Sequence, residues 1–262
     1  MQEEIVQQVI NEVRKKLSPS ETEAQKTPEK SMAGFTEYVG NAFGDTIGLV
    51  IANLDPVLQE KLGIGGQYRS IGIIGSRTGA GPQIMACDEA VKASNTELVK
   101  FELARDTKGG GGHGTLAIFG AEEVSDARRA VEIALKALSW TFGDIYMNEA
   151  GNFCELQYTA RASYALNKYY NAPLGKAWGL IVGCPAGVGV LMADTALKAA
   201  NVEIVMHASP ALNTSYTNEF MIMITGDSGA VKQAVIAGRE VGLKAVTTLG
   251  GPPKSLQTPY IR

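Results

Sequence analysis

Two glycine-rich turns each lie between an apolar run and a helical pattern, the setting in which dinucleotide-binding proteins hold phosphate groups. In the second turn, residues 183–189, Pro185 interrupts the loop, and Met192 stands where the fingerprint requires its third glycine. Glu203 begins the next strand-like run, whereas the ribose-binding acid should end it. The first turn, residues 75–81, departs in the same way and lacks the Lys-Ser/Thr pair of a phosphate loop. Nucleotide binding is therefore not favoured.

The histidines and cysteines show no spacing typical of metal ligands. His113 lies in a glycine-rich loop, His207 ends a strand-like run, and the cysteines are Cys87, Cys154 and Cys184. We expect Cys154 and Cys184 to be buried apolar side chains. No motif marks a catalytic pair of carboxylates, so the residues give no direct support for a catalytic or metal site.

The most unusual local feature is Lys108–Gly114, which contains four consecutive glycines. Such a run loses much conformational entropy on folding, but it permits close backbone approach or more than one conformation. The segment is either a flexible hairpin connection or a backbone-lined opening. Its counterpart in the second half, Pro210–Asn218, is rich in hydroxyl and amide groups that could hydrogen-bond small uncharged polar molecules.

The elements that must position these loops occur twice. Met85–Val99 and Leu191–Val205 follow one pattern, Asp-x-Ala-x-Lys-Ala-x-Asn-x-Glu, at an offset of 106 residues (194 − 88 = 106). The matched pairs are Asp88 and Asp194, Ala90 and Ala196, Lys92 and Lys198, Asn95 and Asn201, and Glu97 and Glu203. The chain is therefore a tandem duplication, and we interpret the acidic helix positions as structural, with a possible role in subunit contacts.

Each copy mixes strands and helices, which predicts an α/β (α+β) fold. In the first copy we expect strands near 47–52, 70–75, 98–104 and 115–119 and helices near 57–62, 83–93 and 122–138. In the second we expect strands near 153–159, 177–182, 203–207 and 220–225 and helices near 162–170, 190–200 and 228–241. The strands beside the glycine loop are close enough to form an antiparallel hairpin, which argues against a purely parallel sheet.

The totals are those of an ordinary globular protein. The 262 residues carry a net charge of −3, which argues against a nucleic-acid or anionic-membrane partner. No apolar run approaches the ~20 residues that a membrane span needs. The N-terminus lacks the apolar core of a signal peptide, and the cysteine usage suits a reducing compartment. We expect a soluble, cytosolic protein.

The N-terminal segment has a composition of its own. Residues 1–17 place apolar side chains at helical spacing between charged and amide residues, which predicts a short amphipathic helix. Residues 18–30 are polar and read as a disordered linker. A lone helix of this length is marginal in water, so its apolar stripe needs a partner, either its own domain or another protein.

The twin Asp-x-Ala-x-Lys-Ala-x-Asn stretches resemble the helix-strand signature of bacterial microcompartment (BMC) shell domains. The order of elements is similar to the circularly permuted, tandem, trimer-forming subclass, and the N-terminus and residues 35–51 look closest to B-type shell proteins of propanediol- or glycerol-utilising compartments. The resemblance implies a pseudohexagonal trimer and divides the chain into residues 1–34, a BMC domain at 35–144 and a second at 145–262.

The resemblance also implies where the openings lie. By position, the central pore loops match Lys108, Gly109, Gly110, Gly111, Gly112, His113, Asn213, Thr214, Ser215 and Tyr216. A smaller channel between the two domains of each subunit matches Asp45, Ser76, Arg77, Thr78, Gly79, Asp144, Asn148 and Glu149. Related trimers have an acidic residue where this chain has Gly79. Neither axial loop contains the cysteine with which some relatives hold an iron–sulfur cluster, so no cofactor or metal is expected.

By this resemblance the protein is a structural shell component and not an enzyme. It would lie in the shell of a cytoplasmic microcompartment, contact other shell proteins, bind encapsulated enzymes through residues 1–17, and pass small neutral molecules such as glycerol or propanediol. The alternatives are a two-lobed enzyme, small-molecule-regulated or nucleotide-dependent, with a site between the repeats, and a ligand-sensing module that does not assemble.

Overall fold

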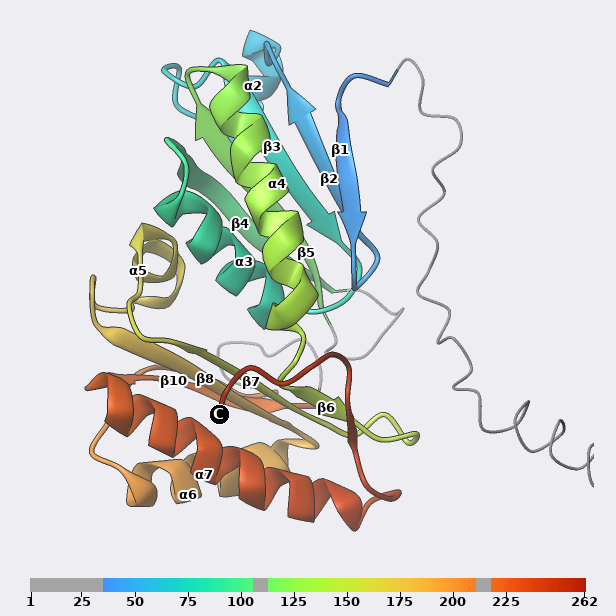
Figure 1. Ribbon diagram of the computed structural model, residues 1–262, viewed down its shortest axis with the longest axis vertical. Helices are drawn as coiled ribbons and strands as arrows, with labels where there is room; N and C mark the ends of the chain where they lie inside the picture. The colour runs from blue at the N-terminus through green and yellow to red at the C-terminus, as the bar shows by residue number, and fades with distance from the viewer. Residues whose placement is uncertain (1–34, 106–112, 211–217) are drawn as a thin grey trace, which may run out of the picture. The chain divides into compact units, whose positions relative to one another are not determined.

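The computed structural model describes residues 35–105, 113–210 and 218–262. Residues 36–262 form one compact unit. The predicted tandem organisation is present within it: each half is an antiparallel sheet with two longer helices packed on one face and a short helix at its end (Figure 1).

The first half contains a sheet of order β1-β2-β3-β5-β4. Its strands are β1 (Tyr38–Ala42), β2 (Thr46–Ile51), β3 (Ser70–Ser76), β4 (Glu97–Arg105) and β5 (His113–Ala121). Its helices are α2 (Pro56–Leu62), α3 (Gly81–Lys92) and α4 (Val124–Thr141). Helix α2 begins as predicted, because the Asp55 carboxylate accepts hydrogen bonds from the backbone N–H groups of Val57 (2.9 Å) and Leu58 (3.2 Å).

The second half repeats this order in a sheet β11-β6-β7-β8-β10-β9. Its strands are β6 (Ile145–Met147), β7 (Phe153–Thr159), β8 (Ala177–Cys184), β9 (Glu203–Ala208), β10 (Phe220–Gly226) and β11 (Lys254–Ser255). Its helices are α5 (Tyr164–Tyr170), α6 (Ala186–Ala199) and α7 (Ser228–Thr247). Among the described residues, no helix is long and apolar enough to cross a membrane.

The predicted hairpin is confirmed, since β4 and β5 pair antiparallel from Glu97 opposite Gly120 to Arg105 opposite His113. Three strands escaped prediction. β1 contains Gly40 and Asn41, residues that disfavour strands, while β6 and β11 are only three and two residues long. Tertiary pairing, rather than local preference, forms these strands.

Helices α6 and α7 extend furthest beyond their predicted bounds. α7 was expected to end at Val241, before a glycine that could cap it, but it continues to Thr247. Gly242 instead lies where α7 packs on α6 and β7, because a Cβ there would come within 2.9 Å of Met192 Cγ and 2.8 Å of Cys154 Sγ. α6 was expected to begin at Val190, and it begins at Ala186.

The second sheet is buried on both faces. Successive side chains of a strand point to opposite faces, so Phe153 and Trp178 lie in a core shared with α3 and α4 of the first half. Leu156 and Ile181 lie in a second core under α6 and α7. The first half therefore serves as the cover for one face of the second sheet, and polar side chains on that face become buried.

Candidate functional site

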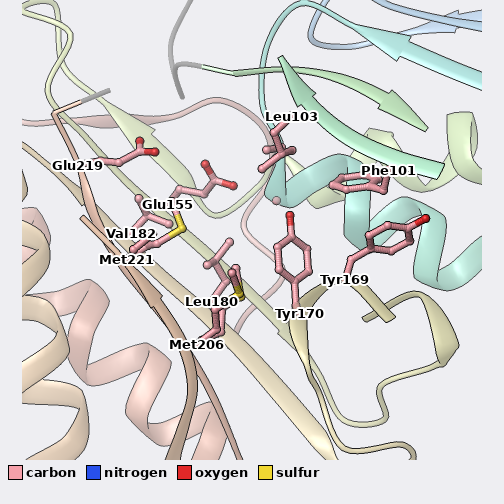
Figure 2. A pocket seen from close by; sticks show the side chains of 14 residues that line it. Phe101, Leu103, Glu155, Tyr169, Tyr170, Leu180, Val182, Met206, Glu219 and Met221 are labelled. Carbon is pink, nitrogen blue, oxygen red and sulfur yellow. The ribbon is translucent and has the colours of Figure 1, made fainter. Parts of the chain in front are cut away.

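A cavity of about 250 Å³ lies where the two halves meet (Figure 2). The first half contributes the beginning of α3 and part of β4, and the second contributes β7, the end of α5 and the strands β8, β9 and β10. The lining residues are Ala80, Gly81, Phe101, Leu103, Glu155, Tyr169, Tyr170, Leu180, Val182, Met206, Ala208, Glu219, Met221 and Met223. Two carboxylates and a mainly apolar wall therefore share one space.

Glu155 is a buried carboxyl group of this cavity whose pKa is strongly raised. It lies in the middle of β7 with 4% of its surface exposed, and its Oε1 has no hydrogen-bond partner among the described residues. Burial, and to a smaller extent the nearby carboxylate of Glu219, raises its pKa to about 8, although the backbone N–H of Gly81 acts in the opposite direction. Near neutral pH, Glu155 therefore holds a proton that an exposed glutamate would release.

Gly81, the first residue of α3, is required for this approach. A Cβ at position 81 would collide with Glu155 Oε1 and come within 2.9 Å of Leu180 Cδ2. The glycine brings the positive end of the helix dipole against the carboxyl group. Gly187 occupies the equivalent position of the second repeat (187 − 81 = 106). It makes no such contact, because nothing lies within 4 Å of a Cβ placed there.

The second carboxylate, Glu219, immediately precedes β10 and is only 1% exposed. In Figure 2 the carboxylates of Glu219 and Glu155 lie toward one side of the pocket, and the rings of Phe101, Tyr169 and Tyr170 lie toward the other. The cavity is thus acidic at one end and aromatic at the other.

Part of the predicted channel set is brought together beside this cavity. The turn at Asp45, whose φ of 50° is left-handed, lies against the 76–79 turn, where the Thr78 N–H donates to the Gly44 carbonyl (3.2 Å). Gln83 Nε2 donates to the Thr78 carbonyl (2.8 Å). The next residues after Gly79 are Ala80 and Gly81 of the lining. The turns that contain Asp45 and Thr78 are therefore neighbours, and Gly79 adjoins the lining along the chain. Ser76 and Arg77 precede Thr78 on the same turn.

The remaining predicted channel residues have other surroundings. Asp144 is fully buried, forms an ion pair with Arg239 (2.9 Å), and accepts the backbone N–H groups of Tyr260 (2.8 Å) and Ile261 (3.0 Å). It thereby fastens the C-terminal segment to the second half. It does not line the cavity.

Asn148 and Glu149 lie in the turn after β6. Asn148 Oδ1 accepts the backbone N–H groups of Ala150 and Asn152, both at 3.1 Å, while Glu149 is exposed. Neither lines the cavity, and the channel role of these residues stays a prediction. The axial loop residues Lys108–Gly112 and Asn213–Tyr216 lie outside the described residues, and His113 is the first residue of β5.

Sequence reasoning missed Glu155 and Glu219. β7 reads Phe-Cys-Glu-Leu-Gln-Tyr-Thr, which is typical of a strand with one solvent face. That face is instead covered by the first half. The repeat itself was the signal for this burial. When two domains stack, one of them must cover a sheet face of the other.

Of the two cysteines expected to be buried, Cys154 is fully buried, whereas Cys184 is partly exposed. Burial raises the pKa of the Cys154 thiol to about 12 and that of Cys184 to about 11. Among the described residues, no group of three or more His, Cys, Asp or Glu side chains is placed to hold a metal ion.

The first of the twin acidic positions joins the two halves. Asp88 Oδ1 accepts from the backbone N–H (2.9 Å) and Oγ (2.5 Å) of Ser163, the residue that precedes α5. Asp88 Oδ2 pairs with Lys92 Nζ (2.5 Å). Burial by itself would lower the pKa of Lys92, but Asp88 and Glu89 raise it above its usual value. The position is structural, as the sequence indicated.

Comparison with known proteins agrees with this architecture. The model of the BMC domain family matches residues 70–148 and 177–250, one match in each half. The bacterial microcompartment shell proteins PduB of Citrobacter freundii and Salmonella typhimurium are each 56% identical over 267 residues, covering 98% of both chains.

Two solved structures are also similar. The crystal structure of a trimeric bacterial microcompartment shell protein PduB is 53% identical with a TM-score of 0.82, covering 86% of this chain and 99% of that one. EtuB from Clostridium kluyveri is 52% identical with a TM-score of 0.83, covering 86% and 98%. The PduB relatives are shell proteins and not enzymes. The chain belongs to the BMC-domain family and is a shell protein of a bacterial microcompartment.

Proposed function

We propose that this shell protein assembles as a trimer of pseudohexagonal outline and tiles, with other shell proteins, the shell of a compartment that degrades propanediol or glycerol. The trimer is inferred from a difference in burial between helices that occupy equivalent positions in the two repeats. α3 and α6 follow the third strand of their repeats, and α2 and α5 precede it. Within the chain, α5 packs on α3, and the equivalent faces of α2 and α6 remain uncovered.

The exposed fractions show this difference. Asp88, Cys87 and Ala90 of α3 are fully buried, whereas on α6 Val190 is 51% and Leu191 43% exposed. The side chain of Asp194, which corresponds to Asp88, is 54% exposed and pairs only along its own helix with Lys198 (2.7 Å).

The short helices α2 and α5 also differ in burial. α5 buries Ala165, Leu166 and Tyr170, but α2 buries no residue, and Val57 is 65% exposed. A contact between α6 of one subunit and α2 of the next would repeat the α3–α5 contact that exists inside the chain. Such a head-to-tail contact closes into a ring, which for two domains per chain is a trimer with six similar domains. The similar PduB structure is described as trimeric.

The interface can be tested by Leu191→Arg on α6. A buried, unpaired guanidinium at a subunit contact should shift the trimer to monomers, as measured by sedimentation at one protein concentration. Leu249→Arg is the matched control, because Leu249 is 44% exposed and belongs to neither helix; it follows α7, and its carbonyl accepts from the side chain of Asn152 (3.1 Å). A trimer that survives Leu191→Arg and dissociates with Leu249→Arg would contradict the proposed contact.

For passage, we propose small neutral polar molecules such as glycerol or 1,2-propanediol, moving through the axial loops and between the two halves. Support comes from buried oxygens that lack a hydrogen-bond partner among the described residues near the start of α3: Ser76 Oγ, Gln83 Oε1 and Glu155 Oε1. Hydroxyl groups satisfy such atoms without adding charge. A channel must bind weakly, with a Kd near the millimolar range of about −4 kcal/mol.

Crystals soaked in glycerol test this proposal. Glycerol is expected within hydrogen-bond distance of the Asp45 or 76–79 turn or of Glu155. Density confined to lattice contacts would contradict passage between the halves.

We also propose that residues 1–17 contact encapsulated enzymes. The amphipathic pattern and the polar segment that follows it support this role, and both lie outside the described residues.

A further inference from the structure

The C-terminal segment, residues 252–262, returns from the end of α7 and contacts both halves of the chain (Figure 1). We call it the C-terminal strap. Its first part forms β11, which pairs with β6 over two residues. Its last part is buried, since Ile261 is only 1% exposed. The end of a chain is poorly ordered unless the fold holds it, so the contacts of this strap identify what it holds in return.

The strap lies against the connector, residues 142–144, which links α4 of the first half to β6 of the second. Ser255 Oγ donates to the carbonyl of Gly143 (2.6 Å). A Cβ at Gly143 would collide with the carbonyl oxygen of Thr258. A glycine in a connector permits many backbone conformations, and the strap packs directly on this one.

The last residue of the connector, Asp144, is bound to the strap by a buried ionic network. Asp144 Oδ2 accepts the backbone N–H groups of Tyr260 (2.8 Å) and Ile261 (3.0 Å). Arg239 of α7 donates through Nη1 to Asp144 Oδ1 (2.9 Å) and to the carbonyl of Ile261 (2.7 Å). A buried ion pair needs such additional hydrogen bonds, and here the strap provides them.

Tyr260 contacts one half with its ring and the other with its hydroxyl group. The ring packs edge-on against Trp140 of α4, with the ring centroids 4.8 Å apart. The hydroxyl donates to Gln157 Oε1 of β7 (2.9 Å) and accepts the backbone N–H of Tyr158 (3.0 Å). Gln157 Nε2 donates to the carbonyl of Thr141, the last residue of α4 (2.9 Å). Tyr260 therefore joins the end of α4 to β7.

We propose that the C-terminal strap is a conformational device that holds the two halves in a fixed position relative to each other, with Tyr260 as its bridging side chain. Hinges are short connecting segments whose dihedral angles change, and the connector at Gly143 is such a segment, covered by the strap. The proposal concerns a single chain, and it depends neither on the trimer nor on the passage of solutes.

A second contact between the halves reports on this role. The backbone N–H of Ser163, before α5, donates to Asp88 Oδ1 of α3 (2.9 Å), and neither residue contacts the strap through a hydrogen bond among the described residues. If the strap fixes the position of the halves, its release must loosen this hydrogen bond as well. If the strap is only local packing, the Ser163 amide must remain protected.

Hydrogen exchange of the full-length protein, resolved to single amides by mass spectrometry, tests the proposal. Tyr260→Ala is expected to exchange at least tenfold faster than wild type at the amides of Tyr158 and Ser163. The central strands β3 and β10, one in each half, should exchange at the wild-type rate. Tyr260→Phe keeps the ring on Trp140, so its effect should be large at Tyr158 and smaller at Ser163.

Gly143→Ala releases the strap from the opposite side. The added Cβ displaces the carbonyl of Thr258 and leaves every residue of the strap unchanged. This variant should therefore reproduce the faster exchange at Ser163. Thr258→Ala is the matched control, because it alters an exposed side chain of the strap, and it should exchange as the wild type does.

Wild-type exchange at Ser163 in Tyr260→Ala and in Gly143→Ala would overturn the proposal, because the strap would then hold only its own surroundings. Faster exchange throughout both halves, β3 and β10 included, would also contradict it. The strap would in that case stabilise the whole fold and not the position of the halves. Neither result bears on the number of chains in the assembly, which sedimentation measures separately.

Discussion

Glu155 lies in the centre of a strand whose two faces are both covered, and its ionisation is therefore linked to folding. In the unfolded chain the carboxyl group titrates near 4.5, and in the folded chain near 8. Between these values the folded protein retains a proton that the unfolded chain loses. The free energy of unfolding should therefore fall as the pH rises from about 4.5 to 8, by at most about 1.4 kcal/mol per pH unit from this residue.

Glu155→Gln should remove that contribution. The substituted protein is expected to gain stability relative to wild type as the pH rises, with the largest difference at pH 8 and above and little difference below pH 4.5. Denaturant unfolding at several pH values and one protein concentration measures both slopes. Parallel slopes from pH 5 to 8 would show that Glu155 titrates normally in the folded state.

The sequence predicts residues well where their environment is local. Asp55 caps α2 as its position before a proline indicates, and the buried thiols follow from their apolar neighbours. The carboxyl groups of Glu155 and Glu219 could not be recognised, because their burial depends on the first half covering the second sheet. Asp144 gave no sign of its ion pair with Arg239 for another reason, because the two residues are 95 positions apart in the chain.

At the scale of the element, identical patterns acquire different surroundings. The twin stretches predict two equivalent helices, α3 and α6, and the structure contains both. Only α3 is covered within the chain, through Asp88 and Ser163. Periodicity identifies an amphipathic helix, but it does not show whether its apolar face packs against the same chain or against a neighbouring one.

The glycines of the helices show a similar limit. Gly242 resembles a helix end in sequence, but α7 continues through it. The glycine is needed there because Met192 and Cys154 occupy the space of a side chain. Local preference gives the correct type of element, and packing decides where the element ends.

Deletion of residues 1–17 tests the proposed role of the N-terminal element. The truncated protein should remain trimeric, because the proposed contact uses α2 and α6. Compartments built from it should retain less enzyme per shell, as measured by quantitative protein staining of purified particles against shells that contain the full-length chain. Loss of the trimer, or unchanged enzyme content, would contradict a role confined to cargo contact.

At the scale of the whole molecule, the proposed assembly follows from the duplication. The contact between α3 and α5 is made inside the chain. We propose that the uncovered surfaces of α2 and α6 make the equivalent contact between chains. A ring of three chains then carries six similar domains, an outline that fits a hexagonal layer. The duplication also makes alternate domains inequivalent, so the cavity with Glu155 and Glu219 occurs once per chain.

Electron microscopy of the purified full-length protein tests shell assembly most directly. At high concentration the protein should form flat sheets with hexagonal tiling, each tile having the mass of three chains. A protein that stays a monomer or dimer and never tiles would contradict the assignment as a trimeric shell component.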